Sequence, residues 1–530
     1  LSPGQLRARL GAGLDVLTSR RRGVPDRQTG FDKAIAWSWQ LLEPWEQGAL
    51  AQAAVFRGGF SLDAAEVVLD LSTWADAPPV LDVLASLCDK SLLRRGATGE
   101  LPDEPRFRMF EGVRAYARAR LQPAEAASAT LARHARFVLD LAERWARCDE
   151  LPAVRERAAH LAAERENIWA LVEPGLDAGA GPGEVALAVR AVAALVPIYE
   201  GRGLRAIVRR ALDHLLELPA SAGAPPAALA ICWRERARVP PRGELARSFL
   251  DRSLALARGH DLHEALAWAT LRLLPMIADA GDLAAYHALL DDSRRRCADQ
   301  PDWRAVCSAL ALSYRMVVPL PPELQTALVA ELPATATTTR RPAVAAQIHW
   351  ALAVNAIFDG ELASARDHFA RVVDAYEDSH DDQASLALAR GNIAAINLAL
   401  DRDLDQARAM AERSRRALLD MGLIEGVPFN EFNLALICEG MGDHVGAEAA
   451  ARRCLDWQGQ LGTGGNWMMR GDTGRVAAAA QLAISLTWQG RVDEATATLA
   501  MTTTWTVEWT AQPPSSANIV AAALALLDAG

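Results

Sequence analysis

The sequence lacks the features of membrane proteins, secreted proteins and proteins held together by disulfides. None of its apolar runs reaches the roughly 18–20 residues that a membrane-spanning helix requires, and no secretory signal opens it. Its 7 cysteines are odd in number and scattered, with no Cys-x-x-Cys pair, which argues against a disulfide framework and a zinc ribbon. We therefore predict a cytoplasmic protein that makes no membrane contact.

Motifs of the common catalytic classes are also missing. Lys33 and Lys90 are the only lysines and neither follows a glycine, so the phosphate-binding sequence Gly-x-x-x-x-Gly-Lys-Ser/Thr is absent. There is no His-Glu-x-x-His or Gly-x-Ser-x-Gly motif. His260 and His263 have a spacing that suits a metal bound from one helix, but no third ligand is near, and we interpret them as surface residues. We predict that these residues contain no catalytic site, metal site or cofactor and are not an enzyme.

Basic charge is in short supply. The formal net charge is −10 and the acidic excess falls beyond residue 121, so neither part carries the bulk basic surface that nucleic acid binding requires. One local basic strip is Arg20–Arg22. We interpret it as a solvated loop, with phosphate contact as the alternative.

What the sequence does have is length and helical periodicity. With 530 residues, 51% of them hydrophobic, the chain should fold into several domains or a repeat array. Between residues 31 and 121, five stretches have apolar residues at helical spacing, and two short runs suit strands joined by a Gly/Pro/Asp-rich turn. Helices are expected within 34–42, 50–55, 61–68, 79–89 and 113–121, and strands at 91–93 and 107–110. This order predicts a winged-helix domain over residues 31–121; a further helix is expected over Ser2–Leu17.

Behind this domain, one position recurs about every 40 residues, where it would open the second helix of a hairpin. The aligned residues are Ala206, Ala246, Tyr286, Ala327, Ala365, Ala407, Ala447 and Ala495. Five residues earlier stands glycine or proline, as a tight turn between helices favours, except at Arg402. Alanine should let the paired helices cross closely, and Tyr286 should splay its hairpin.

This period predicts a mostly α fold, in which about eight tetratricopeptide-like hairpins over residues 181–530 stack as an α-α superhelix with a concave groove. The last interval is longer, and we interpret Gly462–Trp467 within it as an inserted loop rather than a phosphate loop. Residues Asn518–Leu527 are expected to form a helix that caps the far end.

Four segments in order carry a resemblance to a known family. They are "AIAWSWQLL" (Ala34–Leu42), "AVFRGGFSLDAAEVV" (Ala54–Val68), "LDVLASLCDKSLLRR" (Leu81–Arg95) and "RFRMFEGVRAYARARL" (Arg106–Leu121). Together they resemble the region behind the nucleotide-binding core in bacterial STAND-class regulators, the signal transduction ATPases with numerous domains. A fifth segment, "HLAAERENIWALV" (His160–Val172), resembles the family's bridge into its repeats.

The resemblance implies a domain order of effector, P-loop NTPase with a helical lid, winged helix and tetratricopeptide-like repeats. Residues 1–30 would then be the tail of the lid, and residues 122–180 a helical bridge. The NTPase module, with its ATP or ADP, would lie upstream of this chain. The chain itself would bind a protein partner or a small inducer in the groove and relay that event through the winged helix to the NTPase domain. The effector would be a transcriptional regulator or a kinase.

In tetratricopeptide geometry the first helix of each hairpin lines the groove. We place the ligand or partner site there, with asparagines as its centre because a buried amide needs hydrogen-bond partners. The predicted site residues are Trp350, Asn355, Arg390, Asn392, Asn397, Phe429, Asn430, Phe432 and Asn433. The alternative interpretation is that the Trp and Phe side chains only pack between repeats.

Two alternative functions are a free-standing scaffold that binds protein through its repeats, and a winged-helix regulator that binds DNA. The expected groove helix of the winged-helix domain, residues 79–89, contains two acidic side chains and no basic one. Because DNA-reading helices use Arg and Lys for phosphates, the sequence argues against DNA contact by this part.

Overall fold

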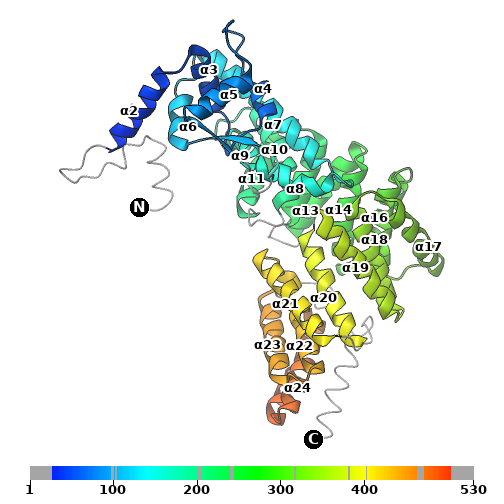
Figure 1. Ribbon diagram of the computed structural model, residues 1–530. Coiled ribbons are helices and arrows are strands. Elements are labelled where there is room, and N and C mark those ends of the chain that lie inside the picture. The colour runs from blue at the N-terminus through cyan, green and yellow to red at the C-terminus, as the bar shows by residue number, and fades with distance from the viewer. Residues whose placement is uncertain are drawn as a thin grey trace. The chain divides into compact units, whose positions relative to one another are not determined.

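The computed structural model describes residues 27–96, 101, 104–199, 205–238, 244–315, 318–379, 382–400, 403–461 and 471–502. The chain divides into two compact units (Figure 1). The winged-helix unit comprises Leu1–Arg147 and Ala159–Leu195, and the array unit comprises Cys148–Ala158 and Val196–Gly530. The helix expected over Ser2–Leu17, the strip Arg20–Arg22, the loop at 462–467 and the helix expected at 518–527 all lie outside the described residues.

The winged-helix unit is mostly helical, with one small sheet. Its elements are α2 (Arg27–Gln40), α3 (Pro44–Ala53), α4 (Leu62–Val68), α5 (Val80–Asp89), β1 (Leu93–Gly96), β2 (Arg106–Met109), α6 (Glu111–Arg118), α7 (Ala124–Ala146), the second part of α8 (Val154–Ala163), α9 (Arg165–Val172), η2 (Glu173–Leu176) and most of α10 (Pro182–Tyr199). Strands β1 and β2 pair antiparallel, with Leu93 opposite Met109. An isolated bridge joins Phe60 to Phe107, so the segment before α4 lies alongside β2.

Local sequence explains where these helices begin. The side chain of Ser61 accepts a hydrogen bond from the backbone of Ala64 and caps α4. At α3, Glu43 and Glu46 form a reciprocal capping box, and Pro44 occupies the first turn. These caps satisfy backbone groups that the first turn of a helix leaves unpaired.

The hairpin is shifted from its expected place. Strand β1 starts at Leu93 rather than at Ser91, because Ser91 has a positive φ of 60° and turns the chain as it leaves α5. The backbone N–H of Leu92 then donates to the carbonyl of Leu87 and closes the end of that helix. Strand β2 ends at Met109, since Phe110 already caps α6.

The array unit is a succession of antiparallel helix pairs. After the end of α10 come α11 (Arg205–Glu217), η3 (Pro219–Gly223), α12 (Pro226–Arg238), α13 (Glu244–Gly259), α14 (His263–Asp279), α15 (Leu283–Arg296), α16 (Pro301–Ser313), α17 (Pro322–Thr338), α18 (Pro342–Phe358), α19 (Leu362–Ser379), α20 (Gln383–Ala399), α21 (Leu404–Asp420), η4 (Ile424–Gly426), α22 (Val427–Gly440), α23 (His444–Leu461), α24 (Gly471–Trp488) and α25 (Val492–Thr502). Successive helices pack on each other, and first helices of neighbouring pairs also touch: α12 with α14, α14 with α16, α16 with α18, α20 with α22 and α22 with α24.

The residues aligned by the sequence period all fall in second helices, from α11 to α25. Ala246, Ala365, Ala407, Ala447 and Ala495 are buried there, as close helix crossing requires. Ala206 and Ala327 are exposed, so at α11 and α17 other residues make the crossing. Tyr286 is also fully buried, which shows that the second helix α15 accommodates its ring.

The turns of the array use glycine for its conformational freedom. Gly281, Gly360, Gly442 and Gly490 have φ values between 74° and 80°, a region that other residues rarely adopt. His260 and His263 do not share a helix: α13 ends at Gly259 and α14 starts at His263, so they cannot chelate a metal from one helix as their spacing suggested.

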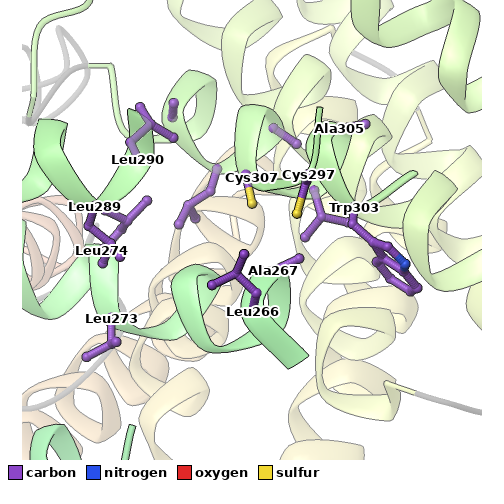
Figure 2. Close-up of a cluster of buried hydrophobic side chains, with 14 of the residues drawn as sticks. Leu266, Ala267, Leu273, Leu274, Leu289, Leu290, Cys297, Trp303, Ala305 and Cys307 are labelled. Carbon is purple, nitrogen blue, oxygen red and sulfur yellow. The ribbon is translucent and has the colours of Figure 1, made fainter. Parts of the chain in front are cut away.

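One hydrophobic core runs through the array from Ala230 in α12 to Leu352 in α18. Figure 2 shows part of it, with leucines of α14 and α15 in one cluster with Trp303 and Cys307 of α16, and with the thiols of Cys297 and Cys307 side by side. Each hairpin thus buries its apolar faces against its neighbours, as repeat proteins do.

The mostly α fold class, a winged-helix domain followed by a superhelix of tetratricopeptide-like hairpins, is confirmed. Among the described residues, no helix is both long and apolar enough for a membrane span.

Candidate functional site

The predicted groove residues lie on three first helices of the array. Trp350 and Asn355 are on α18; Arg390, Asn392 and Asn397 are on α20; Phe429, Asn430, Phe432 and Asn433 are on α22. Because α20 packs against α22, the structure brings the residues of those two helices together.

The centre of this cluster is the point where α20 and α22 cross at Gly391. Asn433 donates from Nδ2 to the carbonyl of Gly391 over 3.3 Å, and a Cβ placed on Gly391 would lie 2.5 Å from Oδ1 of Asn430. Asn430 also donates to the carbonyl of Gly426 over 3.3 Å. Both asparagines are buried, so their amides fill and hold the helix crossing.

Three other polar residues of the predicted site have partners in or next to their own helix or in the helix before it. Asn392 donates to the carbonyl of Leu388 in its own helix over 2.9 Å, and Asn355 donates to Asp359 over 2.7 Å. Arg390 forms an ion pair with Glu377. In the described part of the chain, Oδ1 of Asn397 is buried without a hydrogen-bond partner, as is Oδ1 of Asn430.

The aromatic residues pack within and between repeats. Trp350 meets Phe369 of α19 edge to face, with ring centroids 5.3 Å apart. Phe429 is buried against Cys454 and Ala478, whereas Phe432 packs on the same cluster and is half-buried. A ligand on this wall could therefore reach Trp350, Arg390 and Phe432 without unfolding a helix.

A second candidate site is a cleft in the winged-helix unit that sequence reasoning missed. It encloses about 700 Å³ and is lined by residues from the end of α3 to α6 and by one residue of α9: Ala53, Phe56, Arg57, Gly58, Gly59, Phe60, Arg94, Arg108, Met109, Phe110, Glu111, Arg114, Ala115, Arg118 and Glu166. Three of its five arginines, Arg108, Arg114 and Arg118, fall in one arginine-rich segment, but Arg57 and Arg94 come from elsewhere in the chain, so the sequence does not show that the five meet.

The rim of this cleft is fixed by a buried polar network. Asn167, fully buried on α9, accepts a hydrogen bond from the backbone of Arg57 over 2.7 Å and donates to the carbonyl of Gly59 over 2.8 Å. Gly58 and Gly59 have φ values of 75° and 123°, which only glycine adopts without strain. A Cβ on Gly59 would come within 3.0 Å of the Arg108 side chain, so close approach also requires glycine there.

Positive charge dominates the cleft. Arg114 forms an ion pair with Glu111 at 2.6 Å and Arg57 with Glu173 at 2.6 Å, while the guanidinium of Arg94 lies 4.2 Å above the ring of Phe110. Arg108 and Arg118 have no carboxylate within ion-pair distance among the described residues. Guanidinium groups bind oxyanions through paired N–H donors, so the cleft can hold a multivalent anion.

Comparison with known proteins supports the winged-helix assignment. No curated protein matches this chain. Among solved structures, the chain is similar to the Signal Transduction ATPase with Numerous Domains (STAND) protein with a tetratricopeptide repeat sensor from Pyrococcus horikoshii, at 12% identity and a TM-score of 0.47 over 89% of this chain and 64% of that one. The present chain therefore spans less than two thirds of that protein. Residues 42–122 match the family described as winged helix-turn-helix domain, and the protein contains a domain of that family.

Proposed function

We propose that this chain is the sensor and regulatory half of a STAND-type signalling ATPase. A protein partner or small inducer binds the groove of the array unit, and the winged-helix domain relays that event to a nucleotide-binding core in the parent protein. ATP or ADP belongs to that core, and the effector is a transcriptional regulator or a kinase. The ordered resemblance of four segments to this family supports the proposal.

The observation that carries the proposal is the contact between successive first helices, α12 to α18 and α20 to α24. Such a stack offers repeated helix faces to a partner, which is how repeat proteins form extended binding surfaces. A bound partner regulates only if it favours one packing of the molecule over another through a difference in affinity. The chain crosses from one unit to the other three times, so a change of packing in one unit can act on the other through three covalent connections.

The groove is tested with the double variant N392A/F432A in the full chain. Among the described residues, Asn392 donates only to its own helix, and Phe432 is half-buried, so the variant should fold, which circular dichroism checks. Wild-type chain fixed on beads should retain a defined set of proteins or small molecules from cell extract, identified by mass spectrometry, that the variant loses. The matched control is Arg366→Ala on the second helix α19, which should capture normally. Normal capture by N392A/F432A removes this patch from the proposal.

The link to an ATPase has its own test. The reading frame upstream of Leu1 should encode a Walker-type loop, and the extended protein should bind ATP or ADP. A frame without that loop favours the free-standing scaffold.

Binding of duplex DNA is a second candidate function, favoured by the arginine-lined cleft. Helix α5 argues against it, because Asp82 and Asp89 are its charged residues and Val83, Leu84 and Leu87 are buried in the core. A fluorescence titration with random duplex at low salt decides the matter, since phosphate contacts make affinity strongly salt-dependent. A flat response eliminates this function.

A further inference from the structure

An acidic stretch between α7 and α8 belongs to the array unit although the chain before it and after it belongs to the winged-helix unit. We name residues 149–152, with the sequence Asp-Glu-Leu-Pro, the clasp. It contacts the entrance to α18, nearly two hundred residues further along the chain.

The clasp is held first through its backbone. The N–H of Leu151 donates to the carbonyl of Arg340 over 2.9 Å, and the guanidinium of Arg340 donates back to the carbonyl of Leu151 over 2.9 Å. The clasp itself is a turn rather than an extended segment, because the N–H of Val154 donates to the carbonyl of Glu150 and the N–H of Arg155 to that of Pro152. Arg340 therefore recognises the exposed N–H and carbonyl of Leu151 at this turn, whatever the side chain of that residue.

The side chains add charge recognition. Arg341 pairs with Asp149 at 2.8 Å and with Glu150 at 2.8 Å, and Arg340 lies 3.8 Å from Glu150. A single guanidinium thus binds two successive carboxylates of the clasp, a geometry to which Arg is suited and Lys is not.

The residues that receive the clasp are held by further contacts within the array. Asp302 of α16 fixes Arg341 from the other side at 2.7 Å, and the guanidinium lies 5.4 Å from the ring centre of Trp303. Trp303 in turn packs edge to face on Trp268, with centroids 6.3 Å apart. Arg and Trp anchors held in place in this way are typical of the residues that dominate binding energy at interfaces.

The clasp remains accessible to exchange. The side chains of Arg341, Asp149 and Glu150 are 28%, 26% and 40% exposed, and ion pairs of such exposure are individually weak. The buried anchors of the segment, Val154 and Arg157, come later, in the first turns of α8. Release of residues 149–152 therefore costs α8 only the hydrogen bonds that Val154 and Arg155 donate to the carbonyls of Glu150 and Pro152, while its buried anchors stay in place.

We propose that the surface formed by Arg340, Arg341 and Trp303 is a docking site for an acidic turn of a protein partner, and that the clasp occupies it as an internal ligand. The inference deepens the proposed function by naming the chemistry of the partner, and in that sense rests on it. The partner carries two adjacent carboxylates followed by an apolar residue, as the clasp does. Because the clasp is tethered, its effective concentration is of millimolar order, so it reduces the apparent affinity of any competitor.

The test uses the full chain and a fluorescein-labelled peptide of residues 148–155 as probe. Fluorescence anisotropy should give an affinity at least tenfold higher for the double variant D149N/E150Q, whose clasp is weakened, than for wild type. The control variant D251N/E323Q, which changes two exposed acidic residues elsewhere in the array, should bind as wild type does. Adding Arg341→Ala to D149N/E150Q should reduce the affinity at least tenfold, and the peptide with both acidic residues changed to amides should not bind.

Equal affinity of wild type and D149N/E150Q for the peptide overturns the proposal. If D149N/E150Q does not fold, hydrogen exchange in the wild type tests the proposal instead. Excess peptide should increase the exchange rate of the Leu151 amide, and an unchanged rate also overturns the proposal. Neither outcome affects capture through Asn392 and Phe432, so failure of this inference is distinguishable from failure of the proposed function.

Discussion

Asn167 is a single buried side chain on which the shape of the winged-helix cleft depends. Besides its bonds to Arg57 and Gly59, it donates to Glu164 over 2.6 Å, and Glu164 pairs at 2.5 Å with the buried guanidinium of Arg106. A buried polar group is stable only when it is hydrogen-bonded, so these residues support one another. The segment containing Glu164 and Asn167 could be recognised from sequence by resemblance. Its partners could not, because they lie more than fifty residues away.

His134 provides a pH-dependent prediction. Burial beside Phe56 lowers the pKa of His134 to about 4, below the value near 6.5 of an exposed imidazole. The unfolded chain therefore binds more protons between pH 6.5 and 4. Stability from this residue is complete above pH 6.5 and is lost as the pH falls, by roughly 3 kcal/mol in all.

Chemical denaturation at several pH values measures this effect, and hydrogen exchange is the probe that reports on the winged-helix unit. His134→Gln should flatten the pH dependence of unfolding between pH 6.5 and 4, whatever its effect at neutral pH. Parallel pH profiles for the variant and the wild type would contradict the assignment.

The predicted amide patch illustrates what residue-level reasoning from sequence can and cannot supply. It correctly anticipates that Asn392, Asn430 and Asn433 come from successive first helices. Asn430 and Asn433 meet at a glycine, however, and helical periodicity does not reveal which backbone a side chain will touch. Whether the patch binds a partner stays a prediction.

Helices α20 and α22 depend on the absence of a side chain at Gly391. Replacing Gly391 by Ala places a Cβ 2.5 Å from Oδ1 of Asn430, so the buried amide of Asn430 must move from its place and from its hydrogen bond to Gly426. We expect Gly391→Ala to destabilise the array by about 1–3 kcal/mol, as overpacking of a closely packed site does. Urea denaturation monitored by circular dichroism measures the change.

The matched control is Gly459→Ala in α23, where an added Cβ meets nothing within 4 Å. There alanine only improves helix propensity and should stabilise by up to about 1 kcal/mol. The two substitutions are chemically identical, so a shift of the same sign in both would show that the crossing is not tight.

At the level of elements, the sequence predicts helices better than it predicts their edges. The 40-residue period placed one marker in each second helix because every hairpin repeats the same packing problem. The period did not show that Ala206 and Ala327 are exposed. An alanine can keep its place in the period although the two helices of its hairpin cross at a neighbouring residue. Strand β1 starts later than predicted because Ser91 adopts a backbone conformation that its residue type does not reveal.

The whole molecule should unfold in two steps that correspond to its two units. Phe369, fully buried in the array, packs against Trp350 and Val372 in one cluster. Phe369→Ala should destabilise the array by about 3–5 kcal/mol through the cavity it leaves. Amide exchange measured by mass spectrometry should rise along α18–α20 and stay unchanged in α3–α6. Equal changes in both units would mean that they unfold as one.

The interleaved division of the chain has a practical consequence for dissecting the protein. A fragment that starts at residue 181 contains the predicted repeats but lacks the clasp, and leaves Arg341 without Asp149 and Glu150. A fragment that stops at residue 121 contains the predicted winged helix but leaves the buried Arg106 without its ion-pair partner Glu164. Loss of one partner of a buried ion pair typically costs about 3–5 kcal/mol of folding stability. No single cut yields two intact halves, so pieces for expression must overlap, each running through residues 148–195.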